Sequence, residues 1–186
     1  MRQKGQQSVF GAWEMRYLVS ASEMREYDSN TIERIGIPAC VLMERAALAA
    51  VEAIEEFCAR EGRAMPVLVM AGMGNNGGDG LAVARLLCEK GYRVEVWTVG
   101  DRERASVQWK QQMGILENYP VEYSLQPQRR EYGVLVDALF GVGLSRAVEG
   151  LYAEAIEAFR GLSGWRLSID MPSGIDTDTG RILGRA

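Results

Sequence analysis

The fold of this 186-residue chain is decided by Gly72-Met73-Gly74-Asn75-Asn76-Gly77-Gly78-Asp79-Gly80. The stretch follows a continuous apolar run at 66–71, which is typical of a strand covered on both faces, and it precedes a helical pattern. Gly72, Gly74 and Gly77 satisfy G-x-G-x-x-G, a turn that brings backbone N–H groups and a helix N-terminus close to a phosphate. No Gly-Lys-Ser/Thr follows, so this is not a Walker A loop.

Strand-like and helix-like segments alternate after this loop. We expect strands at 66–71, 93–99, 121–125, 134–137 and 166–170, helices between them at 78–90, 102–117 and 151–159, and two earlier helices at 20–35 and 39–60. The first of these begins at a capping box, Ser20 to Glu23. This order predicts a Rossmann-like, doubly wound α/β fold, in which a mostly parallel sheet preceded by two helices lies in three α/β/α layers.

The sequence predicts one domain with two unusual ends. Residues 1–16 are polar, and we interpret them as a disordered extension or a mis-assigned start, with Met15 as an alternative initiator. Residues 17–186 make up the expected domain. The sequence stops soon after the last expected strand, so we expect this domain to be truncated at its C-terminus.

Composition excludes several classes of function. The net charge of −4 provides no basic field for nucleic acid, and no apolar run reaches the roughly 20 residues that span a bilayer. Cys40, Cys58 and Cys88 are scattered, which indicates reduced thiols in a cytoplasmic protein and argues against a zinc site. The chain has no histidine, so proton transfer must use Asp, Glu, Lys, Tyr, Cys or water.

Three polar features fall at the carboxyl ends of expected strands: the glycine loop, Asp137 and Asp170. Ligands of open α/β sheets bind at that edge, so we expect the three to be neighbours. An ionised Asp137 at the end of an apolar run is costly unless it is paired or coordinating, although it would also serve to cap the next turn. The amides and carboxylate of the glycine loop suit ribose hydroxyls, a hard monovalent cation or phosphate. The alternative is a tight turn without a ligand, which we disfavour because the glycines among these residues are costly to order unless something binds.

These residues resemble the YjeF N-terminal domain family, the NAD(P)H-hydrate epimerases, from about Tyr17 to the end of the chain. The strings Asn75 to Gly80 and Asp170 to Gly174 are its most specific part. Further matching stretches are Ser22-Glu23-Met24 with Asp28 and Thr31-Ile32, Gly36-Ile37-Pro38, Leu42-Met43-Glu44, and Val136 to Gly141. Arg45 and Ala47 depart from the family, which usually has Asn and Gly there.

The resemblance implies an isomerase that interconverts the R and S epimers of NADHX and NADPHX, the hydrated nicotinamide cofactors, for metabolite repair. It implies one K⁺ per subunit, with Asn76, Asp137 and Ser173 as ligands. It also implies a homodimer, and an ADP- or ATP-dependent dehydratase as functional partner, fused to this domain in many bacterial relatives. The implied substrate-binding residues are Asn75, Asn76, Gly77, Gly78, Asp79, Gly141, Val142, Gly143, Leu144, Ser145, Arg146, Ala147 and Asp170.

The expected chemistry needs neither histidine nor a redox cofactor. The substrate carbon bears a hydroxyl beside a ring nitrogen, so protonating that hydroxyl lets water leave and forms an iminium cation. Water then returns to either face. One carboxyl group is sufficient as acid and then base, and Asp170 is our candidate for this catalytic role.

Two other functions remain open from the residues. In an NAD(P)-dependent oxidoreductase module, Asp101 after the second strand would be the ribose-binding acid, although it would equally suit a helix cap. A non-catalytic nucleotide-binding or scaffold protein would keep the fold without turnover. The lack of a separate substrate domain to place a hydride acceptor disfavours the oxidoreductase, and the strand-end carboxylates disfavour the non-catalytic protein.

Overall fold

The sheet has five strands, all parallel, in the order β3-β2-β1-β4-β5. This computed structural model describes residues 18–61, 66–129 and 131–186, so the extension expected at 1–16 lies outside the described residues. The predicted strands are confirmed, with these bounds: β1 Val67–Ala71, β2 Val94–Thr98, β3 Glu122–Ser124, β4 Glu131–Ala138 and β5 Ser163–Ser168. We had expected Asp170 to be the last residue of a strand. Because β5 ends at Ser168, Asp170 lies instead in the turn that follows.

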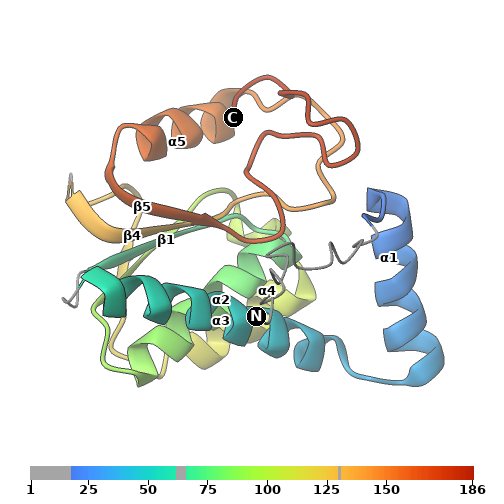
Figure 1. Cartoon of the computed structure of the whole chain (residues 1–186), viewed down its shortest axis with the longest axis horizontal. Helices are drawn as coiled ribbons and strands as arrows, with labels where there is room; N and C mark the ends of the chain where they lie inside the picture. Colours follow the sequence, from blue (N-terminus) through green and yellow to red (C-terminus); the bar gives the residue numbers. More distant parts are fainter. Residues whose placement is uncertain (1–17, 62–65, 130) are drawn as a thin grey trace, which may run out of the picture.

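Helices cover both faces of the sheet, as the Rossmann-like prediction requires (Figure 1). Three of them, α2 (Ala39–Glu61), α3 (Asn75–Glu89) and α4 (Val107–Leu116), pack on one face, and α5 (Gly150–Arg160) packs on the other. After β1 the chain adds β2 and then β3 on one side of β1, and it then adds β4 and β5 on the other side. The carboxyl ends of β1 and β4 therefore flank the point at which the strand order reverses, where such sheets bind ligands.

The residues of β1 explain why its sequence is continuously apolar. Val67, Val69 and Ala71 belong to the core beneath α2, α3 and α4, whereas Leu68 and Met70 belong to the core beneath α5. Side chains alternate between the two faces of a strand, so a strand buried on both faces needs apolar residues at every position. Full burial of each such side chain contributes about 1.5–3 kcal/mol, which fixes β1 at the centre of the sheet.

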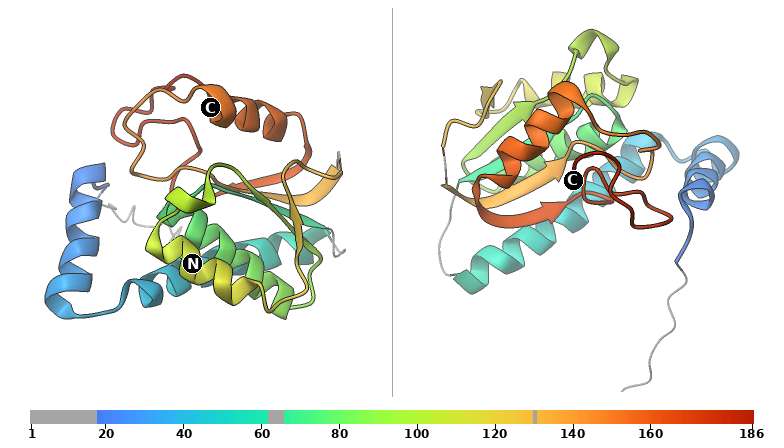
Figure 2. Two further views of the ribbon diagram at one scale, coloured as in Figure 1. Left: turned by 180° about the vertical axis from the view of Figure 1, so that it is seen from behind. Right: turned by 90° about the horizontal axis from the view of Figure 1, so that it is seen from above.

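The first helical segment stands apart from the sheet, beyond the carboxyl ends of the strands (Figures 1 and 2). It consists of α1 (Ala21–Ser29) and a π-helix, η1 (Asn30–Ile35), and it ends at Gly36 with φ 86°. The predicted capping box is confirmed: Ser20 Oγ accepts from the Glu23 N–H at 3.3 Å, and Glu23 Oε2 accepts from the Ser20 N–H at 2.7 Å. A short 3₁₀ helix, η2 (Arg102–Arg104), precedes α4, so the single helix expected at 102–117 is two separate elements.

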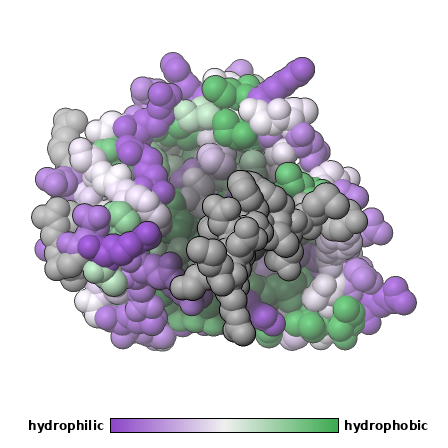
Figure 3. Space-filling model, in the orientation of Figure 1, coloured by the Kyte–Doolittle hydropathy of each residue, from purple (hydrophilic) through white to green (hydrophobic). Residues whose placement is uncertain are grey.

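Hydrophilic side chains cover much of the face shown in Figure 3, and hydrophobic residues interrupt it in separate areas. Along α1, η1 and the start of α2, the exposed large hydrophobic residues include Tyr27, Ile35, Ile37, Val41 and Leu48. None of the helices in the described ranges is both long enough and apolar enough to cross a membrane.

The turn from β1 to α3 depends on a close approach between two glycines. A Cβ atom on Gly77 would overlap the carbonyl oxygen of Gly72, whereas a Cβ on Gly114 in α4 would meet nothing within 4 Å. We expect Gly77→Ala to lower the free energy of unfolding by about 3 kcal/mol, because backbone must move to admit the methyl group. Gly114→Ala is the control and should be neutral or stabilising by up to about 1 kcal/mol. Urea unfolding measures both, and equal values would contradict this account of the turn.

Candidate functional site

The glycine loop leads directly into an uncapped helix N-terminus. Helix α3 begins at Asn75, three residues before the start we predicted, so Asn75 and Asn76 lie in its first turn. Gly74 occupies the N-cap position, and no side chain caps the helix. The first N–H groups of α3 therefore lack intrahelical acceptors and favour an anion at the carboxyl edge of the sheet.

Asn76 is the clearest sign that this edge binds something. Only 9% of the residue is exposed, yet neither Oδ1 nor Nδ2 of its amide has a hydrogen-bond partner in the described part of the chain. Leaving such buried groups unpaired costs about 1–3 kcal/mol each, so the amide is poised for a ligand. Asn75, by contrast, is exposed.

Gly141 joins the loop after β4 to this helix and to the turn after β5. A Cβ atom placed on Gly141 would lie 2.5 Å from Asp170 Oδ2 and 2.9 Å from Asn76 Oδ1. Only a glycine fits between the two side chains. The predicted meeting of three strand-end segments is therefore present in the fold.

Asp137 and Ser173 form a buried polar pair beneath this point. Ser173 donates from Oγ to Asp137 Oδ1 at 2.6 Å and from its backbone N–H to Asp137 Oδ2 at 2.8 Å. Ser173 Oγ also accepts from the Phe140 N–H at 2.9 Å, and Asp137 Oδ1 accepts from the Leu139 N–H at 3.2 Å. Burial raises the pKa of Asp137, and the Ser173 hydrogen bonds act in the opposite direction. Asp137 thus caps the turn after β4 and also ties it to the segment after β5.

Asp170 has an unusual backbone conformation. Its φ of 59° is the only positive value at a non-glycine position within 18–61, 66–129 and 131–186. The Met171 N–H donates to the Ile169 carbonyl at 2.7 Å, so Asp170 is the centre of a three-residue turn. Such strained turns persist only where surrounding structure enforces them, and they concentrate at functional sites. This turn places the Asp170 carboxylate beside Gly141.

Three carboxylates, Asp28, Asp79 and Asp170, lie close enough for their charges to interact. Burial, together with the charges of Asp170 and Asp28, raises the pKa of Asp79 to about 7. Burial and the charge of Asp28 also raise the pKa of Asp170, whereas the Val142 N–H lowers it. Asp28 comes from α1 and was assigned no role from the sequence, because its distance along the chain hides its position beside the two other carboxylates.

The remaining predicted substrate residues differ in their surroundings. Gly77 and Gly78 are buried in the first turn of α3 and, as glycines, offer only peptide groups to a ligand. In the loop after β4, Gly141, Val142 and Leu144 are half-buried, and Leu144 N–H donates to the Gly141 carbonyl at 3.2 Å. The exposed members of this loop are Gly143, Ser145, Arg146 and Ala147. The structure therefore gathers only part of the predicted set around Gly141.

No group of three or more Cys, Asp or Glu in the described residues could hold a metal ion. The candidate potassium ligands are a different set: the Asn76 amide, the Asp137 carboxylate and the Ser173 hydroxyl. All three offer hard oxygen donors, which suit a hard cation, and all three residues are buried. The unpartnered oxygen of Asn76 fits this role because a cation would satisfy it.

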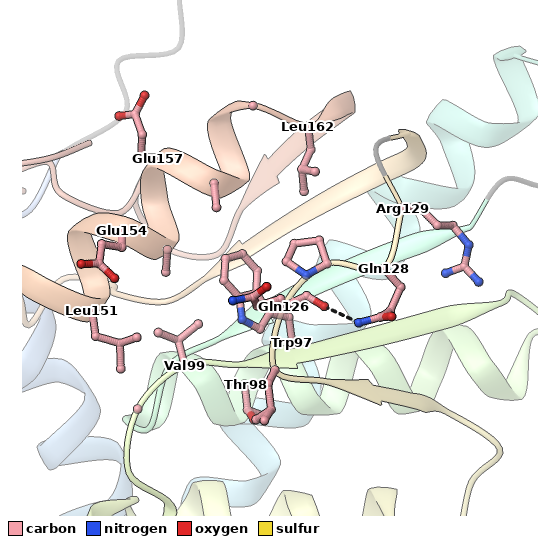
Figure 4. A pocket seen from close by; sticks show the side chains of 16 residues that line it. Trp97, Thr98, Val99, Gln126, Gln128, Arg129, Leu151, Glu154, Glu157 and Leu162 are labelled. Carbon is pink, nitrogen blue, oxygen red and sulfur yellow. Dashed lines mark hydrogen bonds between the residues drawn. The ribbon is translucent and has the colours of Figure 1, made fainter.

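A separate cavity of about 790 Å³ lies between α5 and the edge formed by β2 and β3 (Figure 4). It was not predicted. The described residues 125–129, which lead from β3 toward β4, contain no helix, so the sheet beside Trp97 is left partly uncovered on the α5 face. Glu154 and Glu157 line the cavity, and its one cationic lining residue, Arg129, is paired with Glu95 and Glu122. This lining suits an anionic nucleotide less well than the uncapped N-terminus of α3 does.

The glycine loop, the uncapped helix and the strand-end carboxylates define a Rossmann-like nucleotide-binding domain. Comparison with known proteins is more specific. Residues 39–186 match the family described as YjeF-related protein N-terminus. The chain belongs to this family.

Two curated relatives cover most of this chain. An NAD(P)H-hydrate epimerase of Limosilactobacillus reuteri is 45% identical over 170 residues, which are 91% of this chain and 79% of that protein. An NAD(P)H-hydrate epimerase of Oenococcus oeni is 43% identical over 169 residues, 90% of this chain and 80% of the relative. The crystal structure of the yeast protein ynu0, YNL200c, is similar to this fold with a TM-score of 0.74 and 28% sequence identity. The match covers 90% of this chain and 75% of the yeast chain.

The raised pKa of Asp79 has a consequence for stability. Because folding raises this pKa from 3.8 to about 7, the folded protein binds more protons than the unfolded chain between these pH values. The free energy of unfolding should therefore fall as pH rises through this window. Asp79→Asn should abolish that part of the fall and gain up to about 4 kcal/mol on the wild type between pH ~4 and pH ~8.

Urea unfolding across this range, without K⁺ or nucleotide, measures the effect. Asp176→Asn is the control, because the Thr179 hydrogen bonds lower the pKa of Asp176 and so place its titration below pH ~4. That variant should keep the wild-type slope between pH ~4 and pH ~8. Parallel pH profiles for the wild type and Asp79→Asn would show that Asp79 titrates normally in the folded protein.

Proposed function

We propose that this protein is an NAD(P)H-hydrate epimerase, an isomerase that interconverts the R and S forms of NADHX and NADPHX for metabolite repair. The observation that carries the proposal is the approach of the Asp170 carboxylate and the unpartnered Asn76 amide on either side of Gly141. Both lie at the carboxyl edge of the sheet beside the uncapped start of α3, and relatives of the same family bear this activity in their names.

The geometry suggests how the substrate lies. The diphosphate of the hydrated cofactor binds at the N-terminus of α3, where backbone N–H groups are free to donate. The predicted substrate residues of the two loops, 75–79 and 141–147, then enclose the nucleotide, and the hydrated ring reaches Asp170.

Asp170 acts as the acid and then the base. Its raised pKa keeps a larger share of the carboxyl group protonated near neutral pH. It donates this proton to the ring hydroxyl, the C–O bond breaks, and water leaves with the bonding electrons as the ring nitrogen lone pair forms the C=N bond of the iminium. Water adds to either face of that carbon and returns its proton to the carboxylate. The negative charges of the site stabilise the cation between these two steps.

A potassium ion is part of the proposal. Asn76, Asp137 and Ser173 would hold it with their side-chain oxygens, which are hard donors from the three converging segments. When bound, K⁺ would supply positive charge at a site that is otherwise rich in carboxylates. The protein's own residues carry out the proton transfer.

We further propose the setting of the enzyme. A second copy of the chain would cover the exposed apolar residues Ile35, Ile37, Val41 and Leu48, giving a homodimer. Cys40, Cys58 and Cys88 are free, which suits a reducing cytoplasm. The functional partner is an ADP- or ATP-dependent NAD(P)H-hydrate dehydratase, which consumes one epimer.

An oxidoreductase is less well supported. Its expected ribose-binding acid, Asp101, accepts from the Glu103 N–H at 3.0 Å and so caps η2. The buried unpaired amide and the strained turn at Asp170 also disfavour a non-catalytic scaffold, because both cost stability without a ligand.

The central test of this function is Asp170→Asn. Wild-type protein should accelerate loss of the second NADPHX epimer when an epimer-specific dehydratase consumes the first. We expect Asp170→Asn to lower kcat by about 100-fold or more, because it removes the proton donor and keeps the shape. Asp101→Asn is the matched control and should stay within about threefold of the wild type, because Asn also caps helices well. An Asp170→Asn variant as fast as the wild type would overturn the assignment.

Potassium binding can be tested without catalysis. Replacing Na⁺ by K⁺ at constant ionic strength should raise the Tm of the wild type, because a ligand that binds only the folded state stabilises it. Ser173→Ala should abolish this K⁺-dependent shift. Ser106→Ala, which removes the cap of α4, should lower Tm in both salts but leave the K⁺-dependent shift unchanged. The same Tm in Na⁺ and K⁺ for the wild type would refute the proposed cation.

A further inference from the structure

Helix α1 turns one defined face toward the candidate site. Ala21, Arg25 and Asp28 follow one another at spacings of four and three residues, which places them on one side of the helix. Ala21 is the only buried residue of α1. Arg25 and Asp28 are exposed to solvent, as is Glu26 on the other side of the helix.

Two polar contacts hold this face against the site. The Ala21 N–H donates to Asp178 Oδ1 at 2.7 Å, which fixes the start of α1 to the segment after β5. Arg25 Nη1 reaches the Val142 carbonyl oxygen at 3.5 Å. The backbone N–H of Val142 hydrogen-bonds to the Asp170 carboxylate and lowers its pKa. The loop at 141–147 therefore lies between α1 and the proposed acid.

Asp28 adds a third carboxylate to the pair formed by Asp79 and Asp170. Its charge raises the pKa of Asp79 and of Asp170, in each case in addition to the larger effect of burial. Within the described ranges, none of these three carboxylates forms an ion pair with Lys or Arg. Facing like charges destabilise the empty site, and a ligand that brings positive charge relieves that repulsion.

The buried amide of Asn76 is an independent sign of a ligand at the same place. It is 91% buried, has no partner among the described residues, and lies across Gly141 from Asp170. The carboxylate group and the unpaired amide thus point to one ligand that enters between α1 and α3.

We propose that α1 forms the outer wall of the substrate crevice and that Asp28 faces the nicotinamide ring, where it stabilises positive charge on that ring. The inference rests on the proposed function, in which an iminium cation forms beside Asp170. Asp28 acts through its charge and transfers no proton. Arg25 is a positioning residue, because it holds α1 against the loop that carries Val142.

NADP⁺ and NADPH give a direct probe of this charge preference. They share every group except the ring, which is cationic in NADP⁺ and neutral in NADPH. Calorimetric titration of the wild type should show tighter binding of NADP⁺, by about tenfold. Asp28→Asn should lose most of this preference by weakening NADP⁺ binding alone. Glu26→Gln removes the same charge from the outer side of α1 and should leave both affinities unchanged.

Each remaining result has a defined meaning. If Asp28→Asn weakens both nucleotides equally, or neither, or if Glu26→Gln acts like Asp28→Asn, the inference is wrong. Arg25→Ala should reduce the NADP⁺ preference as well, and Arg25→Lys should restore part of it, which a purely structural contribution to Tm would not do. A wild type that shows the charge preference but no epimerisation would overturn the proposed function and leave the placement of Asp28 supported. A wild type that binds neither nucleotide would overturn the inference, and the epimerisation assay then decides the proposed function by itself.

Discussion

The site depends on the close approach of three peptide segments around Gly141. Asp170 and Asn76 flank this glycine so closely that no side chain fits there, and the turn from β1 to α3 is equally tight where Gly77 meets Gly72. These two approaches bring the loop after β4 onto the first turn of α3. Without them, the carboxyl ends of β1, β4 and β5 would remain neighbours in the sheet, but their polar side chains would not meet at one site.

The predictable part of the fold is the part that follows from periodicity. The apolar run of β1 and the alternation of segments predicted the parallel sheet and its helical layers, because a strand buried on both faces leaves no other pattern. The spacing of Ser20 and Glu23 predicted the capping box, because its hydrogen bonds join residues only three positions apart. The ends of elements were less predictable: α3 starts at Asn75, because glycines weaken the helical signal of its first turn without preventing the helix.

Features that depend on long-range placement were not predictable from the sequence. Asp28 lies far along the chain from Asp79 and Asp170, and only the position of α1 brings their charges together. The positive φ of Asp170 arises from a turn enforced by its surroundings. The cavity beside α5 results from a β3–β4 connection that lacks a helix in its described residues, so the spacing of motifs gave no sign of it.

Charge balance links the stability of the empty protein to the proposed chemistry. Asp28, Asp79, Asp137 and Asp170 concentrate carboxyl groups around a site in which the Asn76 amide has no partner among the described residues. Such a site is destabilised when empty, and it favours what the reaction creates, a cationic ring beside a carboxyl group that exchanges protons. A potassium ion and an uncapped helix would balance the phosphates at the other end of the same ligand.

A crystal structure of the protein with NADP⁺ tests this account most directly. The account predicts the diphosphate at the first turn of α3 and the nicotinamide ring beside Asp170, within the wall that α1 forms. A nucleotide bound instead in the cavity between α5 and β2, with Asn76 still unpaired, would contradict it.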